Sequence, residues 1–200
     1  VAVDNLLQGL LELGINAIRI GKPVKVRENL RKATLDYNIN NHPLNEELEI
    51  IQDENRAIQA QLPKLRGKEK GLAHKDIHRN QKEIKNIERR ITEEILGNAE
   101  VICCTNIGAG HHILGERKFP IVLIDEATQA SEPSALVPIT RGCRQLFLVG
   151  DHKQLPPTVL SKEANGLEVS LFERLIDSNL EPKLLNTQYR MHPVIREFPS

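Results

Sequence analysis

Two adjacent carboxylates, Asp125 and Glu126, directly follow an apolar stretch over residues 121–124. Four apolar, mostly β-branched residues in a row predict a strand buried on both faces, as in a parallel sheet. Ligands of such sheets bind beyond the carboxyl ends of the strands, where this acid pair would lie. In nucleotide hydrolases the first acid of such a pair holds Mg²⁺ and the next activates a water. The alternative is a strand that ends in a solvated acidic turn.

Two further predicted strands end in polar loops. The strand over residues 99–105 leads into a glycine-containing loop, where the Thr105 hydroxyl and backbone N–H groups could contact phosphate. The strand over residues 145–149 leads into the polar turn 150–157, which ends in two prolines. Three strands that each deliver polar residues to one edge of a sheet are hard to explain by packing alone. We therefore expect a ligand site at that edge.

Composition places the chain among ordinary globular proteins. Its 200 residues carry a formal net charge of +0 and only 3% aromatic residues, so whole-chain charge does not indicate a polyanionic partner. The three cysteines form no CxxC pair, and neither a zinc site nor a disulfide framework is predicted. A reducing compartment, cytoplasmic or nuclear, and no membrane association are expected. Because the chain begins with Val inside a helical pattern, we expect a piece of a longer protein.

The first third of the chain alternates helix and strand. A helix is predicted from residue 1 to 13, ended by Gly14, and a short strand over residues 16–20 follows. Residues 24–42 read as a polar connector with one short helical stretch. Helix, glycine and strand in this order are typical of the second half of a βαβ unit.

A pair of helices is predicted next. Apolar residues alternate at spacings of four and three from Leu44 to Leu65, with the polar Asn55 as one member of the seam. Pro63 should end this first helix, Gly67 and Gly71 mark a turn, and a second helix runs to Gly97. The simplest arrangement is an antiparallel helical hairpin inserted into the α/β domain.

Charge is segregated in this hairpin. The first helix is rich in Glu and Asp, whereas the turn and the second helix are rich in Lys and Arg. One interpretation is a basic rail for a phosphate backbone. The other is a solvated helix pair whose opposite charges favour antiparallel pairing. Further helices are predicted over residues 131–137 and 171–176, and a short strand over residues 183–185.

Three motifs now occur in order: the acid pair 125–126 after its strand, the segment 150–157 (GDHKQLPP) and the segment 188–193 (QYRMHP). Together they resemble those of superfamily 1 helicases of the up-frameshift type. Residues 2–7 are similar to the part that follows motif Ia, and residues 103–105 to motif Ic. The resemblance implies part of a RecA-like P-loop NTPase fold, an α/β parallel sheet with an inserted antiparallel helical hairpin.

The resemblance also implies the domain boundaries. Residues 1–42 and 97–185 would belong to the first RecA-like domain, and residues 43–96 to the hairpin insertion. Residues 186–200 would begin the second RecA-like domain. No G-x-x-x-x-G-K-[ST] motif is present, and in this family that phosphate loop lies upstream of motif Ia. The chain by itself is therefore expected to be inactive.

The roles implied for the ATP site follow residue by residue. Asp125 would hold Mg²⁺, Glu126 would polarise the attacking water and Gln154 would sense the γ-phosphate. Arg190 would act as an arginine finger from the second domain. Tyr189 would lie against the adenine, and the remaining nucleotide-binding candidates are Gln188 and Asp151. The alternatives are that Arg190 is a structural arginine and that Gln154 bonds only its own turn.

The nucleic-acid side of the sheet is implied to carry Thr105, Asn106, Pro156 and Pro157. The expected function is an ATP-dependent helicase or translocase that uses ATP and Mg²⁺ on single-stranded RNA or DNA, with RNA favoured. The alternative is a nucleotide-gated, non-catalytic module that binds nucleic acid or protein, with protein partners through the hairpin. A third hypothesis for the function is a helicase arm that is fused to a nuclease.

Overall fold

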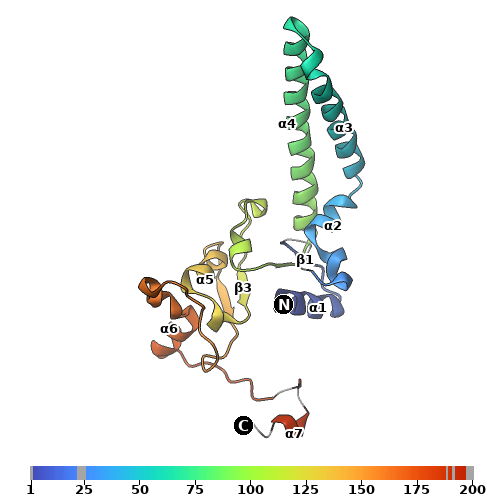
Figure 1. The fold of residues 1–200 in the computed structure, drawn as a ribbon. Coiled ribbons are helices and arrows are strands. Elements are labelled where there is room, and N and C mark those ends of the chain that lie inside the picture. Colours follow the sequence, from blue (N-terminus) through green and yellow to red (C-terminus); the bar gives the residue numbers. More distant parts are fainter. Residues whose placement is uncertain (1, 22–25, 188, 191, 197–200) are drawn as a thin grey trace. The chain divides into compact units, whose positions relative to one another are not determined.

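The computed structural model describes residues 2–21, 26–187, 189–190 and 192–196, and it is an α/β protein (Figure 1). The helices and strands are α1 (Ala2–Glu12), β1 (Ala17–Arg19), α2 (Leu35–Asn40), α3 (Asn45–Gln61), α4 (Gly67–Asn98), β2 (Val101–Cys103), β3 (Ile121–Ile124), α5 (Glu132–Ile139), β4 (Gln145–Leu148), α6 (Leu171–Asp177) and α7 (Pro193–Arg196). Within the described ranges, no helix is long and apolar enough to cross a membrane.

The chain divides into two compact units. The first consists of residues 1–122 and 136–147, and the second of residues 123–135 and 148–200. The core clusters of the first unit bury side chains from α1, β1, β2 and the helices between the two strands.

A parallel strand pair and α1 form the base of the first unit. Leu7 on the apolar face of α1 is completely buried against Ala17 of β1 and Cys103 of β2. Gly14 has a positive φ of 76°, and the helix ends before it as predicted, because glycine adopts this conformation without steric cost. The register of β1 and β2 places Ala17 opposite Val101, so everything between them is one long connection.

The connector after β1 contains two helical segments where one was predicted. A 3-10 helix, Glu28–Ala33, is followed by α2. Thr34 separates them: its backbone is extended, and its hydroxyl accepts the Tyr37 N–H at 3.3 Å as an N-cap. An N-capping Thr starts a new helix at this point because its side chain satisfies a backbone donor that the first turn leaves unpaired.

Helices α3 and α4 lie side by side along their length (Figure 1). Leu48 of α3 and Ile87 and Ile91 of α4 are buried between them. The first helix ends at Gln61, just before Pro63, as predicted. The predicted turn over 67–71 is wrong, because α4 already begins at Gly67 and Gly71 lies inside it. A glycine inside a helix costs about 1 kcal/mol, and the burial of the apolar stripe of this long helix outweighs that cost.

The second strand pair, β3 and β4, is also parallel. The N–H groups of Gln145 and Val149 donate to the carbonyls of Pro120 and Ile124 at 2.9 Å each, at the same sequence offset (145 − 120 = 149 − 124 = 25). A constant offset means that the two strands run in the same direction. Among the described residues β2 pairs with β1 and not with β3 or β4, so for β2 the shared edge of three strands stays a prediction.

The prediction that residues 121–124 are buried on both faces is wrong. Val122 and Ile124 are buried, whereas Ile121 and Leu123 are 62% and 52% exposed. Successive side chains of a strand point to opposite faces, and the described residues cover only one face of β3. The apolar sequence alone does not distinguish these two situations.

The predicted strand at 183–185 is also wrong. Leu184 and Leu185 are 86% and 84% exposed, and their backbone has no regular secondary structure. A strand needs a neighbour to bond its N–H and C=O groups, and no described strand lies alongside. Helix α6, in contrast, forms where it was predicted. Its N-cap Ser170 accepts the Glu173 N–H at 3.1 Å.

Candidate functional site

The acid pair lies in a tight turn directly after β3. Glu126 has φ 54° and ψ 39°, the left-handed conformation, and a 3-10 turn, Ala127–Gln129, follows it. The Asp125 Oδ1 accepts the Glu126 N–H at 3.1 Å. The Gln129 Nε2 donates to Glu126 Oε2 at 3.1 Å. The turn therefore fixes the backbone of both acids and holds the Glu126 carboxylate by a side-chain amide.

The left-handed backbone of Glu126 is itself informative. A residue with a Cβ atom in this conformation carries strain on the order of 1–3 kcal/mol. Such strain persists where the surrounding structure imposes it, and it concentrates at functional sites. Asp125 is half-buried and Glu126 is exposed, so both carboxylates are accessible to a ligand.

A second turn follows β4, and the hydrogen bond between the side chains of Asp151 and Gln154 that closes it is termed the Asp151–Gln154 clasp. Asp151 Oδ2 accepts the Gln154 side-chain amide at 2.9 Å, and its Oδ1 accepts the Lys153 N–H at 3.0 Å. The bond from Gln154, followed by that from the Lys153 N–H, lowers the pKa of Asp151, because both donors favour the carboxylate. The predicted Asp151 and Gln154 are thus joined directly, and Asp151 is ionised at neutral pH.

The two turns meet at the carboxyl ends of β3 and β4. The Ala127 N–H donates to the Val149 carbonyl at 2.8 Å. Gly150 lies so close to the buried Thr128 that a Cβ atom would come within 3.1 Å of the Thr128 backbone nitrogen and side chain. The structure therefore brings the acid pair and the polar turn after β4 together at one edge, as the sequence predicted, and the Asp151–Gln154 bond lies in that turn.

The double proline follows the second turn. Pro157 is buried and Pro156 is exposed, so this rigid segment is anchored by one ring and presents the other. Tyr189 is 93% exposed, and the Arg190 side chain is exposed as well. Gln188 lies outside the described residues. The roles predicted for these residues remain predictions.

In the first unit, the loop after β2 is ordered by its own contacts. Thr105 Oγ1 accepts the Gly108 N–H at 3.1 Å, and a 3-10 turn, Ile107–Gly110, begins after the half-buried Asn106. The guanidinium of Arg141 donates to the Ala109 carbonyl at 2.7 Å and to the Gly115 carbonyl at 3.0 Å. The Thr105 hydroxyl therefore already has a local partner as an acceptor, and its hydrogen remains available to bond a ligand oxygen.

Sequence reasoning missed several residues that organise these loops. Gln129 holds Glu126, Thr128 packs against Gly150, and Arg141 fixes the loop after β2. The usable signal for Gln129 was its position three residues after Glu126, within one tight turn. The other two contacts join residues that are more than twenty positions apart, and no spacing rule indicates them.

An ion pair fixes α6 against the segment that follows the acid turn. Arg174 Nε donates to Glu132 Oε2 at 2.8 Å, and Arg174 Nη2 donates to Glu132 Oε1 at 2.5 Å. The hydrogen bonds from Arg174 lower the pKa of Glu132. This two-point arrangement is the strong geometry of arginine–carboxylate pairs.

The cysteines beside the loop after β2 are neutral thiols. Burial raises the pKa of Cys103 to about 11 and also raises the pKa of Cys104. All three cysteines are free, and no group of three or more His, Cys, Asp or Glu side chains in the described ranges is placed to hold a metal ion.

The fit to Mg²⁺ rests on the donor set of the two turns. Asp125 and Asp151 supply carboxylate oxygens, and Gln154 supplies an amide oxygen, all of them hard donors. Mg²⁺ bound with a nucleotide keeps several waters and takes only one or two protein carboxylates besides the phosphates. The residues present therefore fit Mg²⁺ carried by a nucleotide, and they do not form an all-protein metal cage.

The comparisons with known proteins show the family to which the chain belongs. Residues 1–162 match a family model described as AAA domain, and residues 167–200 match a second model with the same description. Since the first match alone covers most of the chain, the chain belongs to the AAA domain family.

The named relatives of the chain give a narrower assignment than the family models do. The "Regulator of nonsense transcripts 1 homolog" of Neurospora crassa is 39% identical over 206 residues, covering 100% of this chain and 17% of that protein. The "ATP-dependent helicase upf1" of Schizosaccharomyces pombe is 39% identical over 100% of this chain and 20% of that protein. The "ATP-dependent helicase NAM7" of Saccharomyces cerevisiae is 40% identical over 100% of this chain and 19% of that protein. These matches confirm the resemblance to up-frameshift-type helicases, and the chain spans about a fifth of the length of these relatives.

Proposed function

We propose that this protein is an ATP-dependent helicase or translocase that moves on a single strand of nucleic acid, with RNA favoured over DNA. The observation that carries the proposal is the meeting of two clasped turns, Asp125–Glu126 and Asp151–Gln154, at the carboxyl ends of neighbouring parallel strands. Relatives named ATP-dependent helicases align with the whole chain, which supports the same chemistry.

The finer fold assignment is part of this proposal. Residues 1–42 and 97–185 would form part of a RecA-like P-loop NTPase domain, with residues 43–96 as an inserted antiparallel hairpin. Residues 186–200 would begin a second RecA-like domain. The parallel direction of both strand pairs supports this assignment, because RecA-like sheets are built from parallel strands with ligands at their carboxyl ends.

At the ATP site, bound Mg²⁺–ATP would supply the phosphoryl group and neutralise its charge. Asp125 would hold the ion. Glu126 accepts the proton of the attacking water, and the amide of Gln129 keeps its carboxylate in position. Because Asp151 already bonds the Gln154 amide nitrogen, the amide oxygen is left to orient the water or sense the γ-phosphate.

Residues 188–190 complete the ATP site in this proposal. Arg190 stabilises the developing charge as an arginine finger, a role worth roughly 10³–10⁵ in rate in other phosphoryl-transfer enzymes. Tyr189 stacks on the adenine, and Gln188 belongs to the same nucleotide-binding set. Thr105, Asn106, Pro156 and Pro157 contact the nucleic acid. A cytoplasmic or nuclear location is proposed because the three cysteines are free, which fits a reducing compartment.

The test is the substitution Glu126→Gln in the full-length protein. It keeps the size of the side chain and removes the base, so we expect ATP binding to be retained and hydrolysis to fall by about a hundredfold to ten-thousandfold. Fluorescent-nucleotide binding and phosphate release measure the two properties separately. Glu181→Gln, at an exposed position outside the proposed site, is the matched control and should hydrolyse ATP normally.

Unchanged hydrolysis by Glu126→Gln would rule out the assigned base. A wild-type full-length protein that binds ATP without hydrolysing it would instead support the alternative, a nucleotide-gated binding module.

A further inference from the structure

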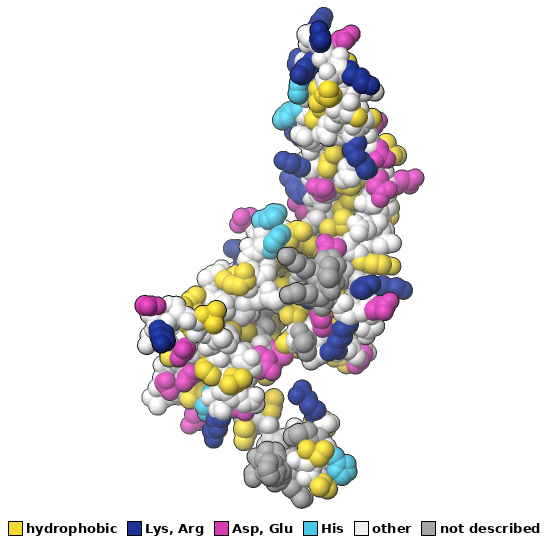
Figure 2. All heavy atoms as spheres, viewed as in Figure 1, with side chains coloured by type: hydrophobic (Ala, Val, Ile, Leu, Met, Phe, Trp, Pro, Cys, Tyr) yellow, Lys and Arg dark blue, Asp and Glu magenta, His cyan; other side chains and the backbone are white. Residues whose placement is uncertain are grey.

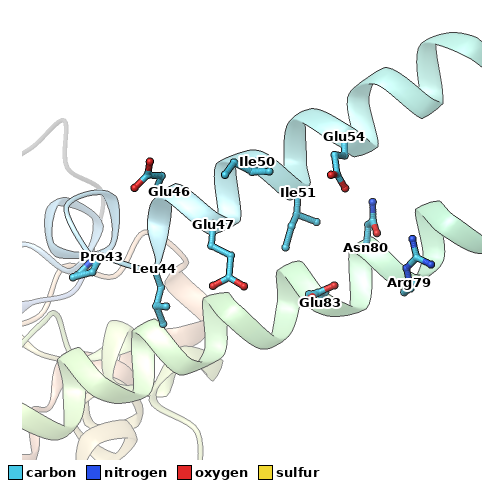
Figure 3. A pocket seen from close by; sticks show the side chains of 10 residues that line it. All are labelled: Pro43, Leu44, Glu46, Glu47, Ile50, Ile51, Glu54, Arg79, Asn80 and Glu83. Atoms are coloured by element: carbon cyan, nitrogen blue, oxygen red, sulfur yellow. The ribbon is translucent and has the colours of Figure 1, made fainter.

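A groove between α3 and α4 has no part in the proposed function. It is an open groove with a volume of about 530 Å³ and lies entirely within the first unit (Figure 3). Its apolar part comes from Leu44, Ile50 and Ile51, and Ile50 is largely exposed. A volume of this size is in the range that holds a small ligand or a few side chains of a peptide.

The rim of the groove is acidic. Glu46, Glu47 and Glu54 of α3 and Glu83 of α4 line it, and none of these carboxylates has an ion pair or side-chain hydrogen bond to another described residue. Arg79 is the sole cation among the lining residues, and its Nη2 already lies 3.2 Å from an Asp76 carboxylate oxygen on its own helix. The groove therefore attracts cations and repels phosphates.

A buried amide is aimed into this groove. Asn80 points from α4 towards α3 (Figure 3) and is only 4% exposed. Its side chain makes no hydrogen bond within the described part of the chain. On the facing helix, the buried Asn55 also has an amide oxygen without a partner. A ligand that bonds the Asn80 amide would therefore add a hydrogen bond that the described residues do not supply.

We propose that this groove binds a short peptide segment of a partner protein that combines basic and aliphatic side chains. Lys or Arg side chains would pair with the glutamates, an aliphatic side chain would cover Ile50 and Ile51, and a peptide group would bond the Asn80 amide. Charge complementarity selects this occupant, because an oligonucleotide would bring phosphates next to four unpaired carboxylates.

This site is separate in character from the basic surface of the same helix pair. Lys and Arg side chains gather at the end where α3 is joined to α4 (Figure 2). Any attraction of phosphate to that end would leave the acidic groove free for a protein. The proposal does not depend on ATP hydrolysis.

The experiment uses the full-length protein and a fluorescein-labelled peptide of three Leu-Arg-Leu-Lys repeats, followed by fluorescence anisotropy. The double charge reversal E47K/E83K should weaken binding by at least about tenfold, because it replaces attraction by repulsion on both walls. The matched control E69K/E88K makes the same change of net charge at exposed α4 positions outside the groove. It should stay within about twofold of the wild type, and added salt should weaken wild-type binding.

The variant N80L tests the amide separately. Leucine has a similar size and no hydrogen-bonding group, so we expect about fivefold weaker peptide binding with helix content unchanged by circular dichroism. Equal losses in E47K/E83K and E69K/E88K would reduce the interaction to bulk charge and overturn the proposal. Unchanged binding of the peptide to E47K/E83K would also overturn the proposal. Displacement of the peptide from the wild type by a single-stranded oligonucleotide would overturn it too, if E47K/E83K binds that oligonucleotide more weakly than the wild type does.

Discussion

Gly150 packs tightly against Thr128, where the two turns of the proposed ATP site meet. The substitution Gly150→Ala would place a methyl group about 3.1 Å from the Thr128 backbone nitrogen, Oγ1 and Cγ2. A backbone atom cannot rotate away, so we expect a loss of about 1–3 kcal/mol in the free energy of unfolding. Urea unfolding measures it.

The control for this substitution is Gly166→Ala. A Cβ atom at position 166 has nothing within 4 Å, so stability should hardly change. Equal stability of Gly150→Ala and the wild type would mean that the two turns are less closely packed than the distances indicate.

At this residue scale the sequence predicted the four polar residues, but neither the bond between Asp151 and Gln154 nor the residues that support the two acids. Asp125, Glu126, Asp151 and Gln154 could be identified because each follows an apolar strand at a place where ligands bind. Gln129 reaches Glu126 only because the backbone turns left-handed at Glu126, and that conformation has no signature in a glutamate. Thr128 meets Gly150 only once β3 and β4 are paired.

At the scale of elements, the Glu132–Arg174 pair should make the docking of α6 depend on pH. The pKa of Glu132 is lowered in the folded protein, so the stabilisation is fully present above the ordinary glutamate pKa of about 4.3. It is lost as pH falls through the lowered pKa. The difference in unfolding free energy between wild type and Arg174→Met should therefore be larger at neutral pH than at about pH 3.

Urea unfolding of both proteins at the two pH values measures this difference. Arg144→Met, at an exposed position, is the control and should show no such pH dependence. A difference between wild type and Arg174→Met that is constant with pH would mean that the arginine stabilises α6 by packing and not by its charge.

The elements themselves were largely predictable where the local pattern is strong. Strand β3 occupies the predicted residues 121–124, and α3 ends before Pro63. The wrong predictions have a common cause, because whether each segment forms a strand, a turn or a helix depends on the elements that lie beside it in the fold. Residues 183–185 have strand-like composition without a pairing partner, and Gly71 is tolerated because the rest of α4 is packed.

At the scale of the whole molecule, the long-range pairing of β1 and β2 was the least accessible property. Ala17 and Val101 are in register although two long helices separate them in sequence. Periodicity gives the direction in which a side chain faces, not the strand beside it. The α/β class followed from the order of elements, while the particular strand pairs found among the described residues, β1 with β2 and β3 with β4, did not.

The phosphate loop that ATP hydrolysis requires is not found in residues 1–200. We therefore expect that these 200 residues, purified alone, release no phosphate from ATP above the level of their own Glu126→Gln variant. A malachite-green phosphate assay with added single-stranded RNA measures this. Turnover by the 200-residue chain at the rate of the full-length protein would mean that another segment of it cradles the phosphates.

The left-handed backbone at Glu126 sets stability and chemistry against each other at one position. Glycine would adopt the same φ and ψ without steric cost, yet it carries no carboxylate. Selection for a more robust fold would therefore favour the very change that removes the proposed base. Under the proposed function, the carboxylate at this position therefore costs folding free energy that glycine would not.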